Sequence, residues 1–168
     1  MNKMESALTT HTRKGLIIVA VLIVLDLLLK KSGIPVSDGL QYLPRLVFSF
    51  IGVVVSCLVF AKQSAGKLKF AEVFAHGFKT TAVIAFLMAV YTYLAVKFIY
   101  AAPTMAEIEA AGKAIEQQGN VMPGEAKQMA IQGANSRWII YVSLSIFASL
   151  IPGILGAVMG AALAKKNQ

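Results

Sequence analysis

The sequence predicts an all-α integral membrane protein with four transmembrane helices and an extracytoplasmic helical hairpin between helices three and four. Of its 168 residues, 57% are apolar and only 14% are charged, which is a much more apolar balance than that of soluble domains. Four long apolar segments alternate with charged ones, and only one polar segment is sizeable. We therefore expect a single domain over residues 1–168, with spans at about 14–30, 43–61, 78–100 and 138–164 and a polar loop at 101–137.

The lengths of the apolar segments fit the thickness of a bilayer. A helix needs about 20 apolar residues to cross a hydrocarbon core of about 30 Å. The third and fourth segments clearly reach this length, whereas the first, GLIIVAVLIVLDLLL (15–29), is short and contains Asp26. Basic residues flank it on both sides and can extend their long side chains to the interfaces. The residues after it, KKSG, form no small-residue cleavage site, so we expect a retained span rather than a signal peptide.

The distribution of charge predicts an orientation. Cytoplasmic loops of membrane proteins are enriched in Lys and Arg. Both termini and the loop between the second and third spans carry more basic than acidic residues, although Lys30 and Lys31 oppose this trend. Four of the eight acidic residues lie in the 101–137 segment, which would then be outside, and Trp138 would join several tyrosines in an outer aromatic belt. We expect both termini to be cytoplasmic.

The net charge of +8 does not indicate nucleic-acid binding. The 16 Lys and Arg residues lie at the ends of apolar runs, and no recognition helix or aromatic-basic platform is present. Cys57 is the only cysteine, which excludes an intrachain disulfide and a cysteine-rich metal site. His11 and His76 have no second ligand at zinc-binding spacing. We therefore expect no nucleic-acid partner, no metal and no cofactor.

The loop between the second and third spans is basic and aromatic. Its three phenylalanines are four residues apart, so on a helix they line one face. Neighbouring lysines suit contact with an anionic cytoplasmic leaflet. One interpretation is an ordinary interfacial start to the third helix, and the other is a cytoplasmic surface for a lipid or a partner, formed by Lys67, Lys69, Phe70, Phe74, Phe78 and Lys79.

The 101–137 segment contains its own helix signals. Thr104 and Glu107 have the spacing of a capping box, and the pattern predicts a helix that ends near Gln118. A second, weaker helix is expected from Gly124 to about Gly133. The resulting hairpin would cap the outer face, either as a solvated connection or as a contact for a periplasmic partner.

Ionisable groups near the ends of the spans suggest an ion pair. Asp26, Lys97 and Arg137 map to similar depths on the outer side, and an unpaired charge in a bilayer is costly. We predict that Asp26 pairs with Lys97 or Arg137 and fixes the helix register. A proton or ion relay through Asp26 is the weaker alternative, because no second carboxylate lies near the midplane.

The fourth span contains small residues at helical spacing. Without a hydrophobic driving force in lipid, membrane helices associate through close backbone approach at such residues. We expect intrachain packing here, with a homodimer or partner interface as the alternative. The predicted packing residues are Gly153, Gly156, Ala157, Gly160 and Ala161.

Several short motifs occur in an order that resembles a known family. They are GKLKF (66–70), AHGFK (75–79), EQQG (116–119) after the third span, and KKN (165–167) after the small-residue helix. The chain resembles the small Bacteroidota inner-membrane proteins catalogued as domain of unknown function 4199. This resemblance implies a multi-pass protein of a bacterial inner membrane with four helices, and it brings no known activity or catalytic residues.

The sequence shows no catalytic constellation. It has no Ser-His-Asp set, carboxylate pair, glycine-rich phosphate loop or metal-ligand spacing. We expect an accessory or scaffold subunit, not an enzyme, that binds membrane lipids, another membrane protein or a second copy of itself. The alternative is a small transporter or channel subunit acting as an oligomer. A third hypothesis is an enzyme on a lipid-linked substrate, using Lys67, Lys69, His76 and Lys79.

Overall fold

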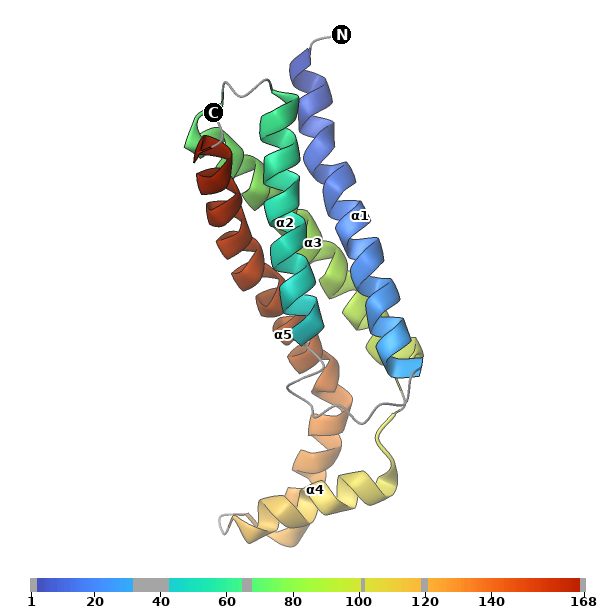
Figure 1. Ribbon diagram of the computed structural model, residues 1–168. Helices are drawn as coiled ribbons and strands as arrows, with labels where there is room; N and C mark the ends of the chain where they lie inside the picture. Colours follow the sequence, from blue (N-terminus) through green and yellow to red (C-terminus); the bar gives the residue numbers. More distant parts are fainter. Residues whose placement is uncertain (1–2, 32–42, 65–67, 101, 119–120, 167–168) are drawn as a thin grey trace. The chain divides into compact units, whose positions relative to one another are not determined.

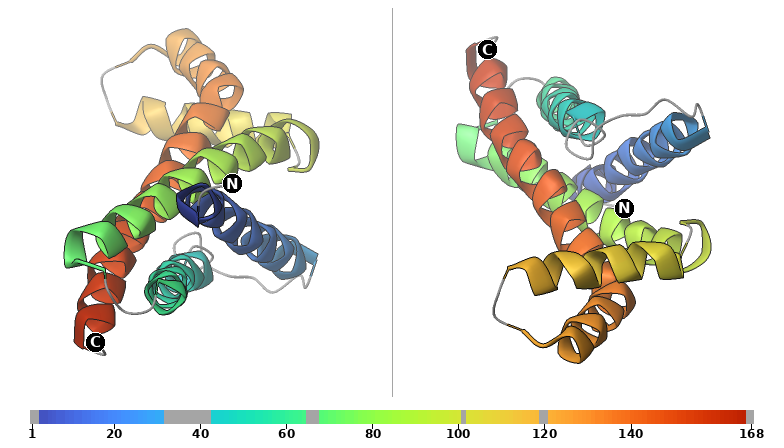
Figure 2. Two further views of the ribbon diagram at one scale, coloured as in Figure 1. Left: turned by 90° about the horizontal axis from the view of Figure 1, so that it is seen from above. Right: turned by 90° about the horizontal axis from the view of Figure 1, so that it is seen from below.

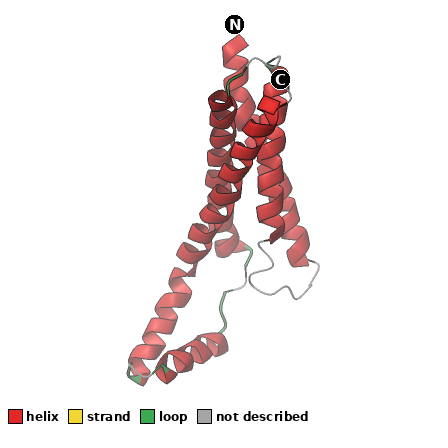
Figure 3. Cartoon of the chain, turned by 60° about the vertical axis from the view of Figure 1, so that its left-hand side comes forward, coloured by secondary structure: helices red, strands yellow, loops and turns green. Residues whose placement is uncertain are grey.

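The computed structural model describes residues 3–31, 43–64, 68–100, 102–118 and 121–166. These residues form helices and loops, with no strand among them (Figures 1 and 3). The prediction of an all-helical chain is therefore confirmed. The helices are α1 (Lys3–Lys31), α2 (Leu43–Gln63), α3 (Phe70–Phe98), α4 (Met105–Gln117) and α5 (Pro123–Lys166).

Three of the described helices, α2, α3 and α5, are long and apolar enough to cross a membrane. These three correspond to the second, third and fourth predicted spans. Helix α1 is not among them, because Arg13, Lys14, Asp26, Lys30 and Lys31 leave only a short uninterrupted apolar stretch.

Helix α5 is a single helix of 44 residues. The separate short helix expected at 124–133 is instead continuous with the last span. The stretch before Trp138 is rich in Ala, Glu, Lys and Gln. These residues favour helix strongly enough that the helix continues past Gly133. The helix also continues through Pro152.

The chain divides into two compact units. The first comprises Met1–Tyr91 and Ser145–Gln168, and the second comprises Thr92–Leu144. Helices α3 and α5 each contribute to both units, so each unit is described below by itself.

In the first unit, α1 and α2 lie alongside the first part of α3 and the last part of α5 (Figures 1 and 2). All four helices contribute to one core, and its buried residues are Val19, Leu22, Val53, Cys57, Ala61, Val73, Ile84, Met88, Ala157, Ala161 and Ala164. Large apolar side chains also cover the outside: Phe86 is 68% exposed and Leu155 is 57% exposed. An apolar surface on both the inside and the outside of a bundle is typical of helices surrounded by lipid.

Small residues allow the helices of this unit to approach closely. A Cβ atom added at Gly77 of α3 would lie 2.5 Å from the Cys57 sulfur and 2.7 Å from the Ala157 Cβ. One added at Gly160 of α5 would lie 2.6 Å from the Cys57 Cβ. Real Cβ atoms do not approach other atoms this closely, so α2, α3 and α5 can cross here only with glycine at both positions.

The predicted packing residues of α5 are all buried in the first unit. Gly153 faces Thr81 of α3, and Gly156 faces the backbone carbonyl of Phe50 in α2. In this arrangement, α2 and α3 of the same chain cover the small-residue face. Such contact between backbones replaces the hydrophobic effect as the source of helix association in lipid.

The second unit consists of the end of α3, helix α4 and the first part of α5. The predicted capping box is confirmed: the Glu107 N–H donates to the Thr104 hydroxyl, and the Thr104 N–H donates to the Glu107 carboxylate at 2.7 Å. Helix α4 lies beside the first turns of α5 (Figure 3). Gly112 and Ala126 are both buried at this contact, where an added Cβ at Gly112 would lie 3.6 Å from the Lys127 Cα.

We expect Gly156→Ala to destabilise the first unit. The added Cβ would lie 2.7 Å from the Phe50 carbonyl oxygen, and this backbone atom cannot rotate away as a side chain could. Overpacking of this kind typically costs about 1–3 kcal/mol. Thermal unfolding in mild detergent should show a melting temperature several degrees lower. Gly133→Ala is the matched control, because its Cβ would meet nothing within 4 Å. Equal effects of the two substitutions would contradict close packing at Gly156.

We expect the start of α4 to depend on pH. Hydrogen bonds from the Thr104 backbone and hydroxyl lower the pKa of Glu107 below its usual value. Because the folded pKa is the lower one, this stabilisation is complete above the ordinary Glu pKa of about 4.3 and is lost as the pH falls through the folded value.

Amide hydrogen exchange at Glu107 and Ile108 measures this cap. Loss of an N-cap costs about 1 kcal/mol, so Thr104→Ala should increase exchange there about five-fold at neutral pH. Amides in the last turn of α4 should be unaffected. Uniform acceleration along α4 would show that the substitution acts on the whole helix and not on its cap.

Candidate functional site

The interior of the first unit contains buried hydroxyl groups as well as apolar side chains. Ser49, Ser56, Thr80, Thr81, Ser145 and Ser149 are all buried. Part of this set is satisfied locally: Thr81 donates to the Gly77 carbonyl at 2.9 Å, and Ser149 donates to the Ser145 carbonyl at 2.9 Å. Such bonds to the preceding turn let a hydroxyl group lie inside an apolar bundle at little cost.

Near one end of the unit, α1, α2 and α3 meet in a polar cluster around His76. The His76 Nε2 lies 3.2 Å from the Ser56 hydroxyl, and that hydroxyl lies 3.4 Å from the Thr80 hydroxyl. The His76 ring stacks on Phe60, with 4.0 Å between the ring centroids. From α1, Lys14 Nζ donates to the Ser56 carbonyl at 3.3 Å. We call these five residues the His76 cluster.

The His76 cluster has the chemistry of an anchor between helices. The described contacts of His76 include the hydroxyl of Ser56, the ring of Phe60 and the ring of His11, with 6.2 Å between the two histidine centroids. A catalytic triad would need a carboxylate next to the histidine. The described contacts of His76 are a serine hydroxyl and two aromatic rings instead. The sequence alone did not suggest these contacts of His76. The available signal was Thr80, one turn after His76 and on the same helix face.

A second polar group lies toward the other end of the first unit. The Tyr91 hydroxyl donates to Asp26 Oδ2 at 2.8 Å, and Lys30 Nζ lies 3.2 Å from the same oxygen. Arg45 donates to the Ser145 hydroxyl at 2.6 Å, and this hydroxyl donates to the Met88 carbonyl. The structure thus gives Asp26 partners on α1 and α3 that the sequence did not suggest.

Lys97 and Arg137 belong to the second unit. There they line a cavity of about 280 Å³ together with Trp138. The predicted pairing of Asp26 with Lys97 or Arg137 would join the two units, and it stays a prediction.

The three phenylalanines of the predicted cytoplasmic surface begin α3 and form a ladder of rings. The centroids of Phe70 and Phe74 are 6.2 Å apart, as are those of Phe74 and Phe78. Phe70 is 40% exposed and Phe78 is 47% exposed, and the side chains of Lys69 and Lys79 are exposed as well. Lys67, which was predicted to join them, lies outside the described residues.

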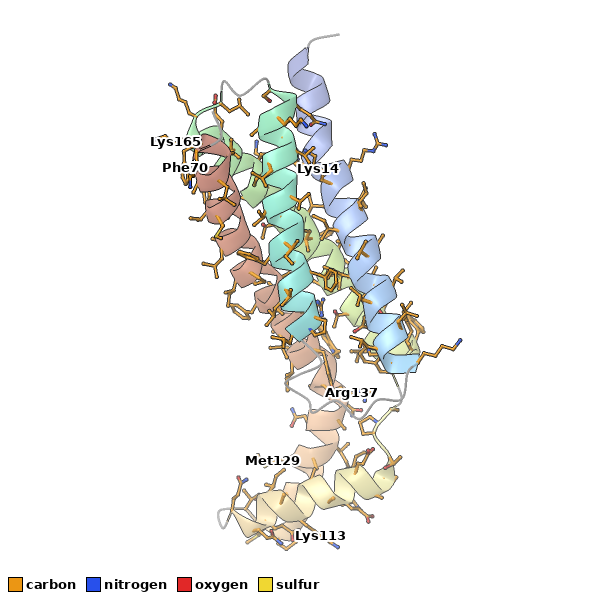
Figure 4. All side chains as sticks on the ribbon, viewed as in Figure 1. Lys14, Phe70, Lys113, Met129, Arg137 and Lys165 are labelled. Carbon is orange, nitrogen blue, oxygen red and sulfur yellow. The ribbon has the colours of Figure 1, made fainter. Side chains whose placement is uncertain are left out.

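Basic residues lie at the same end of the first unit as this ladder. Figure 4 shows Lys14, Phe70 and Lys165 toward this end, although they come from three different helices. We use the name Phe-Lys surface for Lys69, Phe70, Phe74, Phe78 and Lys79. This surface combines exposed rings with long cationic side chains, which is a composition suited to a membrane interface.

Metal chemistry has little support among the residues that the structure describes. They contain no group of three His, Cys, Asp or Glu side chains placed to hold a metal ion. Cys57 is buried, and its thiol lies 3.7 Å from the Val73 carbonyl oxygen. Its surroundings are those of a packing residue.

These features define a helical protein with membrane-like apolar helices. The chain belongs to the family described as "Protein of unknown function (DUF4199)", whose model matches residues 13–166. The resemblance to domain of unknown function 4199 that the sequence showed is thereby confirmed. No curated protein and no solved structure matches the chain. The family description names no activity, so any function must be argued from the geometry of the chain itself.

We expect the Tyr91–Asp26 hydrogen bond to stabilise the first unit. Hydrogen bonds to charged acceptors contribute about 1.5–3 kcal/mol, and the partial exposure of Asp26 places this one near the lower limit. Tyr91→Phe should therefore lower the free energy of unfolding by about 1.5 kcal/mol. In an Asp26→Asn background the same substitution should cost less.

The matched control for this cycle is Tyr93→Phe. Tyr93 also lies on α3, but its described contact is a ring contact with Trp138 and not a hydrogen bond. Its effect should be the same in both backgrounds, as measured by denaturant unfolding in detergent micelles. Strict additivity of Tyr91→Phe and Asp26→Asn would contradict the proposed contribution of this bond.

Proposed function

We propose that this protein is an accessory or scaffold subunit of the bacterial inner membrane that binds anionic lipid or a membrane partner through the Phe-Lys surface. The observation that carries this proposal is the ladder of phenylalanine rings on α3, in which Phe70 and Phe78 are exposed, between two exposed lysines. The proposal includes four spans, with both termini in the cytoplasm and a helical hairpin of α4 and the start of α5 outside.

The packing of α1 supports a fourth span. Its residues Val19 and Leu22 are buried in the core of the first unit. Gly15 packs so closely on α3 that an added Cβ would lie 2.7 Å from Val83. On its opposite side, Ile17 and Val24 are more than half exposed. A helix that is apolar both toward and away from its neighbours needs an apolar solvent, so α1 belongs in the bilayer with α2 and α3.

The charges of α1 are compatible with this position. Asp26 accepts a hydrogen bond from Tyr91 and pairs with Lys30, so its charge is compensated inside the first unit. Arg13 and Lys14 precede the apolar stretch, and Lys30 and Lys31 follow it. Their long side chains can reach the two interfaces from the ends of a short span.

The orientation proposal rests on the distribution of charge. Lys14, Phe70 of the Phe-Lys surface and Lys165 of α5 lie toward one end of the first unit (Figure 4). An anionic cytoplasmic leaflet attracts each lysine near its surface by about 1 kcal/mol. The loop region that contains α4 is rich in Glu and follows the opposite end of α3, so it is the segment that would be translocated.

A small transporter or channel subunit, acting as an oligomer, is the second candidate function. The buried hydroxyls of the first unit favour it, and in particular Ser49, whose hydroxyl is fully buried without a hydrogen-bond partner among the described residues. Polar groups at depth are what a permeation path requires. Loss of an ion-coupled flux in proteoliposomes on Asp26→Asn, with folding intact, would favour this candidate over the accessory function.

The topology can be tested by cysteine labelling of intact spheroplasts with a membrane-impermeant maleimide. Cys57 is buried and does not compete. Lys31→Cys and Ala110→Cys, both at exposed positions, should react from outside, whereas Thr12→Cys should react only after permeabilisation. Reaction of Thr12→Cys and Lys31→Cys from the same side would show that α1 does not cross the membrane.

The binding function can be tested by mild-detergent extraction, followed by mass spectrometry of copurified lipids and chains. Replacing both Lys69 and Lys79 by Gln should reduce the phosphatidylglycerol bound at this surface, or a bound partner chain, by up to roughly thirty-fold, since each lysine contributes about 1 kcal/mol. Lys113→Gln, which removes an exposed lysine of α4 outside this surface, is the control and should have no effect. A protein that runs as a monomer with neither lipid nor partner bound would contradict the proposal.

A further inference from the structure

The second unit contains a cavity that no part of the proposed function uses. It has a volume of about 280 Å³ and lies where the end of α3, the residues before α4, α4 itself and α5 meet. Lys97, Asn135, Arg137 and Trp138 supply its polar lining, and Val96 and Ile108 supply apolar walls. We call it the headgroup cavity.

The polar lining of the headgroup cavity suits an anion. Lys97 and Arg137 provide two cations, Asn135 provides an amide, and the described residues of the lining include no carboxylate. A guanidinium group binds phosphate oxygens through two parallel N–H bonds, and an ammonium group adds a mobile point charge. Two such cations beside an apolar wall are therefore a suitable receptor for a phosphate group attached to an apolar molecule.

Glu107, at the start of α4, is an acidic residue whose charge Arg137 influences. The charge of Arg137 lowers the pKa of Glu107, although less than the hydrogen bonds from Thr104 do. These bonds, at 2.7 Å from the Thr104 N–H and 3.0 Å from its hydroxyl, hold the Glu107 carboxylate at the N-terminus of α4. The carboxylate is committed to the cap and does not form part of the cavity wall.

Aromatic pairs place the cavity at the depth of lipid headgroups. Trp138 packs edge-to-face on Tyr93, with 5.4 Å between the centroids, and Tyr100 packs edge-to-face on Tyr141 at 6.2 Å. Trp and Tyr concentrate where hydrocarbon meets headgroups, because their rings are apolar and their N–H or O–H groups seek water.

Exposed apolar side chains next to these pairs offer a path for acyl chains. Phe98 is 80% exposed, and Ile140, two residues after Trp138, is 69% exposed. On α3, Phe98 directly follows Lys97, and on α5, Ile140 lies within one turn of Arg137. A ligand with one charged end and one apolar end would be in contact with both.

We propose that the headgroup cavity binds the phosphate of a membrane phospholipid, with Arg137 and Lys97 on the phosphate oxygens and the acyl chains along the exposed apolar surface of α3 and α5. The volume is near the lower limit for small-molecule sites, so it accommodates a headgroup and leaves the chains outside. In the proposed topology this lipid belongs to the outer leaflet. The site is separate from the Phe-Lys surface, and either can fail without the other.

Trp138 lines the cavity and is the only tryptophan of the chain, so its fluorescence reports on this site directly. The full-length protein in mild detergent is titrated with dioctanoyl phosphatidylglycerol, with dioctanoylglycerol and with inorganic phosphate. We expect a saturable change in Trp138 emission with the phospholipid alone. Equal saturation by dioctanoylglycerol would overturn the role of the phosphate. Saturation by inorganic phosphate at the same concentration would overturn the assignment to a lipid.

Variants assign the binding to the two cations. Arg137→Gln should weaken phosphatidylglycerol binding at least about ten-fold, and Arg137→Lys, which keeps the charge but not the paired N–H groups, should weaken it less. Lys113→Gln removes an exposed lysine of α4 that does not line the cavity and should leave the affinity unchanged. Lys97→Gln provides a second test if Arg137→Gln lowers the melting temperature. Affinities of Lys97→Gln and Arg137→Lys equal to that of Lys113→Gln would overturn the proposal.

Discussion

The close approach of α2, α3 and α5 around Cys57 is the constraint on which the first unit depends. Gly77 and Gly160 contact Cys57 from two different helices, and neither position has room for a Cβ atom. In lipid, helices gain little from excluding water, so backbone contact and dispersion must hold the bundle together. Once these three helices are fixed, the apolar stretch of α1 has a groove to occupy, and Val19 and Leu22 complete the core.

The same close packing explains why the interior tolerates so many hydroxyl groups. Serine and threonine are small enough to lie between closely packed helices, and several of them bond to carbonyls of their own helix. Two others bond across helices: Ser56 of α2 to His76 of α3, and Ser145 of α5 to Met88 of α3. Polar contacts of this kind fix the rotation of one helix against another, which apolar contacts alone do less specifically.

The charged residues fall into groups with different chemistry. Lys30 and Tyr91 compensate Asp26, whereas Lys14 contacts a backbone carbonyl and an aromatic ring in the His76 cluster. Lys69 and Lys79 are exposed beside phenylalanine rings, and Lys97 and Arg137 line a cavity beside Trp138. In the last two groups the cations border apolar surface, and this arrangement underlies both proposals for lipid contact.

The sequence by itself determined the helical class, the positions of α2, α3 and the apolar part of α5, the cap at Thr104 and the family. Each of these depends on local pattern: apolar length, hydrogen bonds within one turn, or motif order. It missed the continuity of α5 and the partners of Asp26 and His76. Tyr91 lies 65 residues from Asp26, and the Ser56–His76 contact joins two helices. Only tertiary structure decides such contacts, because rotation and crossing of packed helices set which faces meet, and neither is encoded within a single segment.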